Sequence, residues 1–319
     1  MKNKTKETLK KQHYALVGEH SGIQVCRWNK KSLLDEGACY KAKFYGIKSH
    51  ECCQMTPCFL CQNQCLHCWR AVELTIGEKL GKTDEPKKII EECVIKQRKM
   101  ISGFGGNKKL NRNKFREAQT PKQFAISLSG EPTLYPKIAE LIKELRNQGK
   151  TSFLVTNGLL PKKLRELAKK KVLPTQLYVS LNYPDEKTFK EITRNRSRNA
   201  WKQFNETLSI LSRLKTRRVL RMTLVRRLNM QDDQIKNYAK LIKKARPDFV
   251  EAKAYMSVGF ARERLGYDRM PMHPEIRLFA KKLEKALGKP YKILDEHIPS
   301  RVVLIGKNKK KMKITPEQV

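Results

Sequence analysis

The sequence predicts an α/β fold made of repeated βα units, the pattern of a full or partial βα barrel. Short runs of β-branched and aromatic residues alternate with longer amphipathic stretches between residues 54 and 254. A polar or glycine-containing motif follows each of the six short runs. Functional side chains of βα barrels gather where the strands end, so these motifs predict a site at one end of the barrel.

The individual elements can be placed from their periodicity and composition. We expect strands at 54–60, 124–128, 152–156, 176–181, 219–225 and 248–254, with short additional strands at 291–295 and 301–305. Helices are expected near 85–101, 136–148, 161–171, 200–215 and 231–245, with Pro136 and Pro161 in the first turns of two of them. The lysine-rich segments 1–12 and 307–313 are expected to be mobile.

The charge balance predicts a polyanionic partner. The chain has 69 Lys and Arg against 31 Asp and Glu, a formal net charge of +38 that is spread along its whole length. Such an excess attracts polyanions over long range, and nucleic acid is the leading candidate. The alternatives are an adaptation for solubility or salt tolerance, or the lysine enrichment of a thermophile, which glutamate usually balances.

The chain is expected to be cytoplasmic and not to enter a membrane. No apolar run approaches the roughly 20 residues that span a bilayer, and the lysine-rich start is unlike a secretory signal. Nine cysteines in a cytoplasmic protein favour metal binding or redox chemistry over structural disulfides.

Cys61, Cys65 and Cys68 have the spacing C-x3-C-x2-C. Three thiolates on a tight loop can each ligate one iron of a [4Fe–4S] cluster, whose usual complement is four. The iron without a protein ligand can chelate the amino and carboxylate groups of S-adenosylmethionine. A zinc site remains the alternative, since Cys58-x2-Cys61 and Cys65-x2-Cys68 read as two pairs, but zinc modules usually separate such pairs by a dozen or more residues.

This cysteine motif, followed by Gly130-Glu131-Pro132 at the end of a strand, resembles the radical S-adenosylmethionine superfamily. The resemblance implies that Gly130, Glu131 and Pro132 bind the methionine part of the cofactor. Asn157, Ser180 and Asn182 follow the next two strands and are expected to contact its carboxylate and ribose.

Cys26, Cys39 and Cys52 form a second set, with 12 residues between successive members. They favour a second cluster, with a coincidence of buried free cysteines as the alternative. The neighbouring Cys53 and Cys58 leave the choice of ligands open.

A closer resemblance rests on motifs that span residues 14–295. They are Cys-Arg-Trp at 26–28, Cys-Tyr-Lys at 39–41, the segments 43–50 and 126–136, Cys-Trp-Arg at 68–70, and Val-Glu-Ala-Lys-Ala-Tyr-Met at 250–256. In these the chain resembles the archaeal tRNA 4-demethylwyosine synthases of wyosine and wybutosine formation.

The resemblance implies a partial (βα)6 barrel at 51–290, with a cysteine-rich extension at 1–50 and a C-terminal extension at 291–319. It implies a carbon–carbon lyase that condenses N1-methylguanosine-37 of tRNA(Phe) with pyruvate. Two [4Fe–4S] clusters are then expected, one on Cys61, Cys65 and Cys68 that binds S-adenosylmethionine, and an auxiliary one on Cys26, Cys39 and Cys52.

The resemblance also makes Lys41 the lysine that holds pyruvate as a Schiff base. Chelation of pyruvate by the auxiliary iron, with Lys41 as a proton donor, remains open. Electrons are expected from a separate ferredoxin- or flavodoxin-like protein. The alternatives in function are a radical enzyme that acts on protein, such as a glycyl-radical activase, and a non-catalytic zinc protein that binds RNA.

Six arginines near strand ends are candidates for contacts with tRNA phosphates around the mouth of the barrel, with ordinary surface charge as the alternative for most single members. They are Arg194, Arg196, Arg226, Arg227, Arg262 and Arg264.

Overall fold

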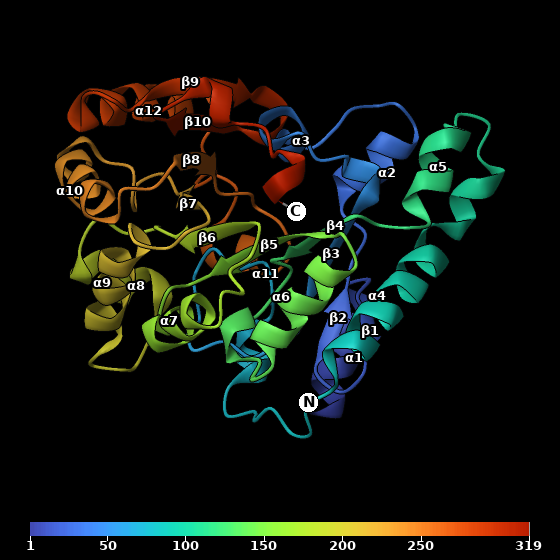
Figure 1. Cartoon of the computed structure of the whole chain (residues 1–319). Helices are drawn as coiled ribbons and strands as arrows, with labels where there is room; N and C mark the ends of the chain where they lie inside the picture. The colour runs from blue at the N-terminus through green and yellow to red at the C-terminus, as the bar shows by residue number, and fades with distance from the viewer. Residues whose placement is uncertain (319) are drawn as a thin grey trace.

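The computed structural model describes residues 1–318, and a ten-stranded sheet forms its centre (Figure 1). Its strands lie in the order β1-β2-β3-β4-β5-β6-β7-β8-β10-β9. They span Ala15–Val17 (β1), Ser21–Ile23 (β2), Cys52–Thr56 (β3), Gln123–Ile126 (β4), Thr151–Thr156 (β5), Gln176–Ser180 (β6), Arg217–Leu224 (β7), Phe249–Ala254 (β8), Lys292–His297 (β9) and Val302–Gly306 (β10). Val319, the last residue of the expected C-terminal extension, lies outside the described residues.

The six strands β3 to β8 pair in parallel and confirm the partial (βα)6 barrel. The hairpin β1–β2 adds antiparallel strands next to β3, and β10 and β9 add antiparallel strands next to β8. Within residues 1–318 no pairing joins β1 to β9, so the barrel stays open along one side.

Helices cover the outer face of the parallel strands (Figure 1). The principal ones are α4 (Pro86–Ile101), α6 (Ile138–Asn147), α7 (Pro161–Lys169), α8 (Glu186–Thr193), α9 (Ala200–Leu211), α10 (Ile235–Ala245) and α12 (His273–Leu287). α10 illustrates why they form, because Ile235, Tyr238, Ala239 and Ile242 lie on one face of the helix and are all buried. The five helices expected from periodicity are present, although α6 begins two residues after Pro136.

Five further helices lie around the ends of the barrel. They are α1 (Asn3–Lys11), α2 (Arg27–Leu33), α3 (Tyr40–Tyr45), α5 (Arg112–Ala118) and α11 (Phe260–Leu265). Of these, α3 matters most for the site, because Tyr45 packs inside the barrel against Phe153, Tyr178 and Phe249, with ring centroids 5.8–6.5 Å apart. Alternate residues of the strands point outward, where Leu154, for example, joins the core beneath the helices.

The expected mobility of the two lysine-rich segments is wrong for the described residues. Residues 3–11 form α1, where Leu9 is buried and the Thr5 hydroxyl donates to Glu78 Oε1 at 2.8 Å. In segment 307–313, Met312 is only 4% exposed and packs in the inner core. In each charged segment a buried apolar side chain, together with polar contacts to the rest of the chain, fixes the backbone against the barrel.

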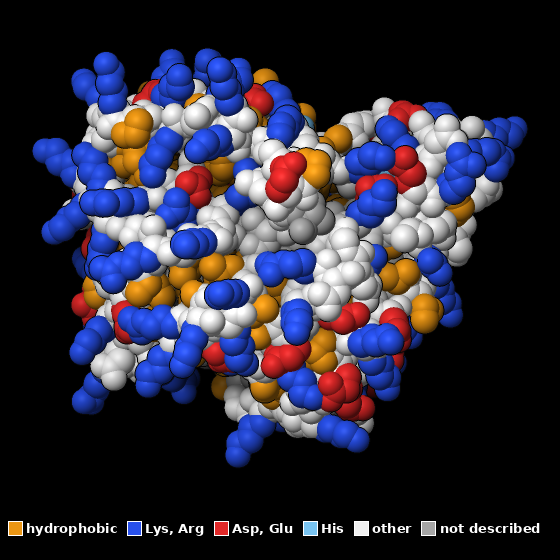
Figure 2. All heavy atoms as spheres, viewed as in Figure 1, with side chains coloured by type: hydrophobic (Ala, Val, Ile, Leu, Met, Phe, Trp, Pro, Cys, Tyr) orange, Lys and Arg blue, Asp and Glu red, His pale blue; other side chains and the backbone are white. Residues whose placement is uncertain are grey.

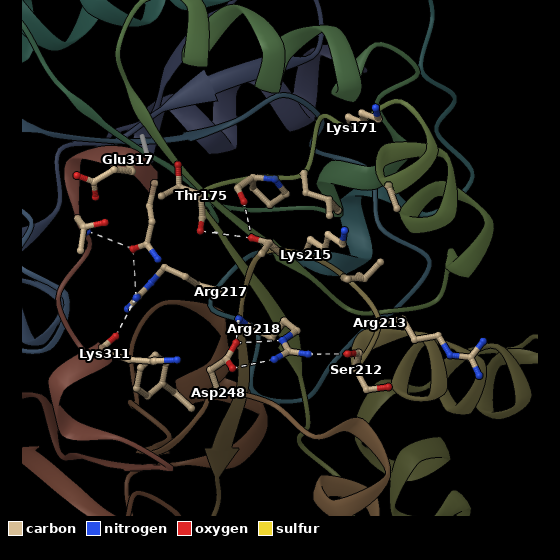
Figure 3. Close-up of a pocket in the computed structure, with 18 of the residues that line it drawn as sticks. Lys171, Thr175, Ser212, Arg213, Lys215, Arg217, Arg218, Asp248, Lys311 and Glu317 are labelled. Atoms are coloured by element: carbon tan, nitrogen blue, oxygen red, sulfur yellow. Dashed lines mark hydrogen bonds and ion pairs between the residues drawn. The ribbon is translucent and has the colours of Figure 1, made fainter.

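Arg217, at the start of β7, fastens the C-terminal segment. It donates to the carbonyl oxygens of Lys311 at 2.9 Å and Met312 at 2.5 Å, and to Gln176 Oε1 at 2.9 Å. Figure 3 shows this residue beside a cavity of about 1310 Å³ at the amino ends of β6, β7 and β8. The cavity contains no cysteine among its lining residues, and it lies at the end of the barrel away from the motifs that follow the strands.

Replacing Arg217 by Met should destabilise the protein by about 2–3 kcal/mol, because several buried carbonyl groups would lose a charged donor. The measurement is the melting temperature, together with denaturant unfolding. Arg213→Met is the matched control, since Arg213 is exposed on the same cavity. Equal melting temperatures for the two variants would show that Arg217 does not hold the segment.

Candidate active site

A second cavity, of about 250 Å³, lies where the parallel strands end, and it brings the predicted cofactor site together. The cysteine motif follows β3, the Gly-Glu-Pro motif follows β4, and the remaining side chains come from the ends of β5 and β6. The predicted residues that line it are Cys61, Cys65, Cys68, Gly130, Glu131, Pro132, Asn157, Ser180 and Asn182.

The cysteine loop is held by backbone contacts to the end of α8. The amides of Gln64 and Leu66 donate to the carbonyl oxygens of Thr193 and Ile192 at 2.8 and 2.9 Å. Burial raises the pKa of the Cys61 thiol to about 11, so that a bound metal is what would stabilise its thiolate.

Arg264, from α11, is the main support of this loop. One terminal nitrogen of its guanidinium donates to the carbonyl oxygens of Cys65, Leu66 and Cys68 at 3.1, 3.0 and 2.8 Å. The other donates to Arg70 O at 2.6 Å, and its Nε lies 3.3 Å from Glu73. The expectation that Arg264 contacts phosphate is therefore wrong, because its donors already face the loop.

The donor set fits an iron–sulfur cluster better than zinc. Three cysteines line the cavity, and in neither cysteine trio of the described chain do all three sulfurs lie within 4.8 Å of one another. Four sulfurs around one zinc ion would lie only about 3.8 Å apart, from a Zn–S distance near 2.3 Å. In a cubane each thiolate ligates a different iron, which requires wider spacing. Two further polar atoms of the cavity lining, His67 Nδ1 and Ser129 Oγ, are buried and have no hydrogen-bond partner among residues 1–318.

Gly130 is required by the close approach of the cysteine segment. Its φ of +70° favours glycine, and a Cβ atom at this position would lie 2.0 Å from Cys58 O. The next residue, Glu131, is 1% exposed and its carboxylate accepts from Thr133 Oγ1, Thr156 Oγ1 and the Asn157 amide at 2.6–2.7 Å. Burial raises the pKa of Glu131, and these donors oppose that shift.

The other predicted contacts join neighbouring strand ends to the loop. Asn157 Nδ2 donates to Gln62 Oε1 at 3.1 Å and lies 3.8 Å from Cys61 Sγ. Asn182 contacts His67 Nε2 at 3.3 Å and accepts from the Thr223 amide at 2.7 Å. Burial lowers the pKa of His67 to about 4, so this ring is neutral near pH 7.

The second cysteine set gathers around α2, α3 and β3. Cys26 and Cys39 precede the first turns of α2 and α3, and Cys52 begins β3. Their thiols are close enough to influence one another, since each of Cys39 and Cys52 has its pKa raised first by burial and next by the charge of Cys26.

Cys53 lies on the other face of β3. Alternation along the strand turns it toward α4, where its thiol contacts Cys93 and both residues are fully buried. Cys58 does not line the cofactor cavity and is 0% exposed in the outer core. The geometry thus separates Cys52 from both residues that could replace it.

Lys41 lies on the first turn of α3 and extends into the barrel. Its Nζ is 5.2 Å from the ring centroid of Phe153 and 5.0 Å from that of Tyr178. Burial lowers the pKa of this amine, and the nearby charge of Arg221 lowers it further. The lysine is 8% exposed and is therefore shielded from bulk water.

Three charged residues inside the barrel, Arg221, Glu251 and Lys253, were not predicted as part of the site. Glu251 is 0% exposed and accepts from the hydroxyl groups of Tyr40 and Tyr45 at 3.0 and 2.7 Å. Lys253 Nζ donates to Ser300 O at 3.0 Å. The available signal was the alternation of Glu251 and Lys253 with apolar residues along β8, and a charged Arg221 within the mostly apolar second half of β7.

Lys and Arg side chains cover much of the surface visible in Figure 2, with fewer Asp and Glu among them. Four of the six predicted phosphate contacts lie within ion-pair distance of a carboxylate. Arg226 is paired with Glu275, Arg227 with Asp268, and Arg194 and Arg264 both reach Glu73. Arg196 and Arg262 are exposed and have no ion pair among residues 1–318, and Arg227 is exposed as well. Among residues 1–318 no helix is both long enough and apolar enough to cross a membrane.

Comparison with family profiles identifies two regions. The radical SAM superfamily matches residues 55–239, and a family described as wyosine base formation matches residues 244–307. Together the two profiles cover the parallel strands and the following C-terminal strands.

Similar proteins carry one shared name, S-adenosyl-L-methionine-dependent tRNA 4-demethylwyosine synthase. The protein from Pyrococcus abyssi is 49% identical over 93% of this chain and 86% of its own length. That from Methanocaldococcus jannaschii is 38% identical over 95% of this chain and 96% of its own. The human protein is 37% identical over 96% of this chain, which corresponds to 41% of the human one.

Two solved structures share the whole fold. One, described as TYW1 with a lysine–pyruvate adduct bound, has a TM-score of 0.86 and 37% identity, with 99% of each chain covered. The other, described as archaeal TYW1, has a TM-score of 0.79 and 34% identity at the same coverage.

Replacing Arg264 by Met should loosen the cysteine loop and lower iron retention roughly 10- to 100-fold, as changes behind metal ligands commonly do. Iron and sulfide content after anaerobic reconstitution, followed by challenge with a chelator, measures the effect. Arg262→Met, an exposed change on the same helix, is the control. Loss of iron in both variants would point to α11 as a whole rather than to the loop contacts.

Proposed function

Because this chain belongs to the family of S-adenosylmethionine-dependent tRNA 4-demethylwyosine synthases, we propose that it condenses N1-methylguanosine-37 of tRNA(Phe) with pyruvate held on Lys41. Family membership itself makes the protein a radical S-adenosylmethionine enzyme of wyosine formation that acts on tRNA. The proposal concerns the co-substrate, the particular tRNA and the residues that act on them. The position of Lys41 inside the barrel, beside Cys39 and Cys52 of the second cysteine set, is the observation that carries it.

Cys61, Cys65 and Cys68 would hold the [4Fe–4S] cluster that the superfamily uses. When bound there, the cluster and S-adenosylmethionine supply the radical that starts the reaction. Gly130, Glu131 and Pro132 would bind the methionine part. Asn157, Ser180 and Asn182 would contact the carboxylate and ribose from the neighbouring strand ends.

Cys26, Cys39 and Cys52 would hold an auxiliary [4Fe–4S] cluster. Three cysteines again leave one iron without a protein ligand. In this view residues 1–50 are an extension that carries most of these ligands, 51–290 form the barrel, and 291–319 form a C-terminal extension.

Lys41 acts as the nucleophile toward pyruvate in this proposal. Its neutral amine adds to the C2 carbonyl, and water leaves as the Schiff base forms. Burial lowers the pKa of Lys41 and so favours the neutral amine that this step needs. The solved TYW1 structure with a lysine–pyruvate adduct supports the same role here.

The tRNA would approach at the carboxyl ends of the strands, where the cofactor cavity lies. The target base has to leave the anticodon loop to reach this cavity, as base-modifying enzymes generally require. Exposed Arg196, Arg227 and Arg262 would contact phosphates there. A ferredoxin- or flavodoxin-like protein would supply electrons, and the enzyme would work in the cytoplasm.

A pair of neighbouring cysteines tests the auxiliary cluster. Cys52→Ala should lower the iron content of reconstituted protein from about eight to about four atoms per chain. Cys53→Ala is the matched control and should keep about eight, because Cys53 faces Cys93 instead. Iron analysis with Mössbauer spectroscopy gives the readout, and full iron content in Cys52→Ala would contradict the assignment.

Borohydride reduction tests the covalent role of Lys41. Wild-type protein incubated with pyruvate and borohydride should gain a stable adduct on Lys41, located by peptide mass spectrometry. Lys41→Arg should show none, whereas Lys43→Arg should react normally because Lys43 pairs with Asp295 outside the barrel. An unmodified wild-type Lys41 would remove the Schiff base and favour chelated pyruvate.

A further inference from the structure

Arg221 lies in the middle of β7 and points into the barrel. Along β7 alternate residues face inward, so Arg221 lies between Val219 in the inner core and Thr223 beside the cofactor cavity. Arg221 itself lines that cavity, together with Cys61, Cys65 and Cys68. Lys41 Nζ lies 5.0 Å from the ring centroid of Tyr178, and Tyr178 pairs with Val219 of β7. Arg221 is therefore the next inward-facing residue of β7 from the level of the amine toward the cofactor cavity.

The guanidinium of Arg221 has no partner among residues 1–318. Its Nε is buried without a hydrogen bond, and no side-chain hydrogen bond or ion pair reaches its other nitrogens. The neighbouring arginines of β7 differ, since Arg217 holds the C-terminal segment and Arg218 is paired with Asp248 at 2.8 Å. A guanidinium inside a barrel with no hydrogen bond and no ion pair is costly, so Arg221 indicates an anion site.

The protein groups around Arg221 are already engaged or carry the wrong charge. Glu251 is the carboxylate whose charge acts on both Arg221 and Lys41, and its oxygens accept from Tyr40 and Tyr45. Lys253 is positive and donates to a backbone carbonyl. Arg221 and Lys253 therefore face a single carboxylate whose oxygens already have donors, and this part of the barrel has an excess of positive charge.

We propose that Arg221 binds the carboxylate of the 2-oxo acid whose carbonyl carbon reacts with Lys41. This inference rests on the proposed function, because it assumes a carbonyl substrate at that lysine. A 2-oxo acid carries its carboxylate on the atom next to the carbonyl, and it therefore needs an amine and an anion-binding group close together. Arginine suits the second role, because its planar donors can bind both carboxylate oxygens at once.

Arg221 thereby determines specificity. It favours 2-oxo acids over ketones and aldehydes of similar size, which could also form an imine but have no carboxylate. It also fixes the orientation of the bound acid, because the carboxylate is directed to β7 while the carbonyl carbon is held at α3.

The test compares Arg221→Met and Arg221→Lys with wild type, using two probes and two readouts. The probes are pyruvate and hydroxyacetone, a ketone of similar size without a carboxylate. The readouts are the borohydride-trapped adduct on Lys41 and equilibrium binding of radiolabelled pyruvate. Circular dichroism and iron content establish that each variant is folded and loaded.

We expect Arg221→Met to need roughly 10- to 100-fold more pyruvate for half-maximal trapping, with hydroxyacetone trapping unchanged. Arg221→Lys keeps the charge but loses two-point binding, so it should lie between wild type and Arg221→Met. If Arg221→Met does not fold, the same intermediate loss in Arg221→Lys supports the assignment, and wild-type pyruvate affinity in Arg221→Lys overturns it.

Unchanged pyruvate trapping and binding in Arg221→Met would overturn the proposal and place the carboxylate elsewhere, for example on an iron atom. Failure of the proposed function looks different, because wild type itself would then give no Lys41 adduct. In that case equilibrium binding of radiolabelled pyruvate still tests the role of Arg221. Weaker binding in Arg221→Met than in wild type supports the role, and equal binding rejects it.

Discussion

The buried carboxylate of Glu251 is the constraint on which the arrangement of this site depends. It lies inside the barrel on β8, away from water, where its oxygens need hydrogen-bond donors. Tyr40 and Tyr45 supply these donors from positions 211 and 206 residues earlier in the chain. The contacts hold α3 in the open barrel, and α3 carries Lys41 and Cys39 with it. Two hydrogen bonds thus join the cysteine-rich segment to strand β8 of the barrel.

Long-range polar contacts also position the cofactor loop. The loop follows β3, yet its carbonyl groups are held by Arg264 from α11, almost 200 residues later. At the other end of the barrel, Arg217 holds the C-terminal segment across the amino ends of the strands. Aromatic residues of α3 and of the strands fill the interior of the barrel next to this end.

Much of the site was predictable because its residues follow strands that can themselves be predicted from the sequence pattern. The carboxyl ends of parallel strands meet at one edge, so motifs after β3, β4, β5 and β6 had to converge. The convergence of these motifs on one cavity could therefore be predicted without knowing any side-chain contact. Arg264 was misjudged for the opposite reason, since its partners are backbone carbonyls that no sequence motif marks.

The sequence by itself determined the order of the βα units, the C-x3-C-x2-C loop and the family, because periodicity and short spacings are local properties of a chain. The tertiary structure decided what distant residues do together. It turned Cys52 toward Cys26 and Cys39 and Cys53 toward Cys93, and it placed Lys41 beside Arg221. It also fixed two lysine-rich segments that composition marked as mobile. The physical reason is that burial and pairing depend on which side chains come into contact across the barrel. Those contacts form only when the sheet has formed.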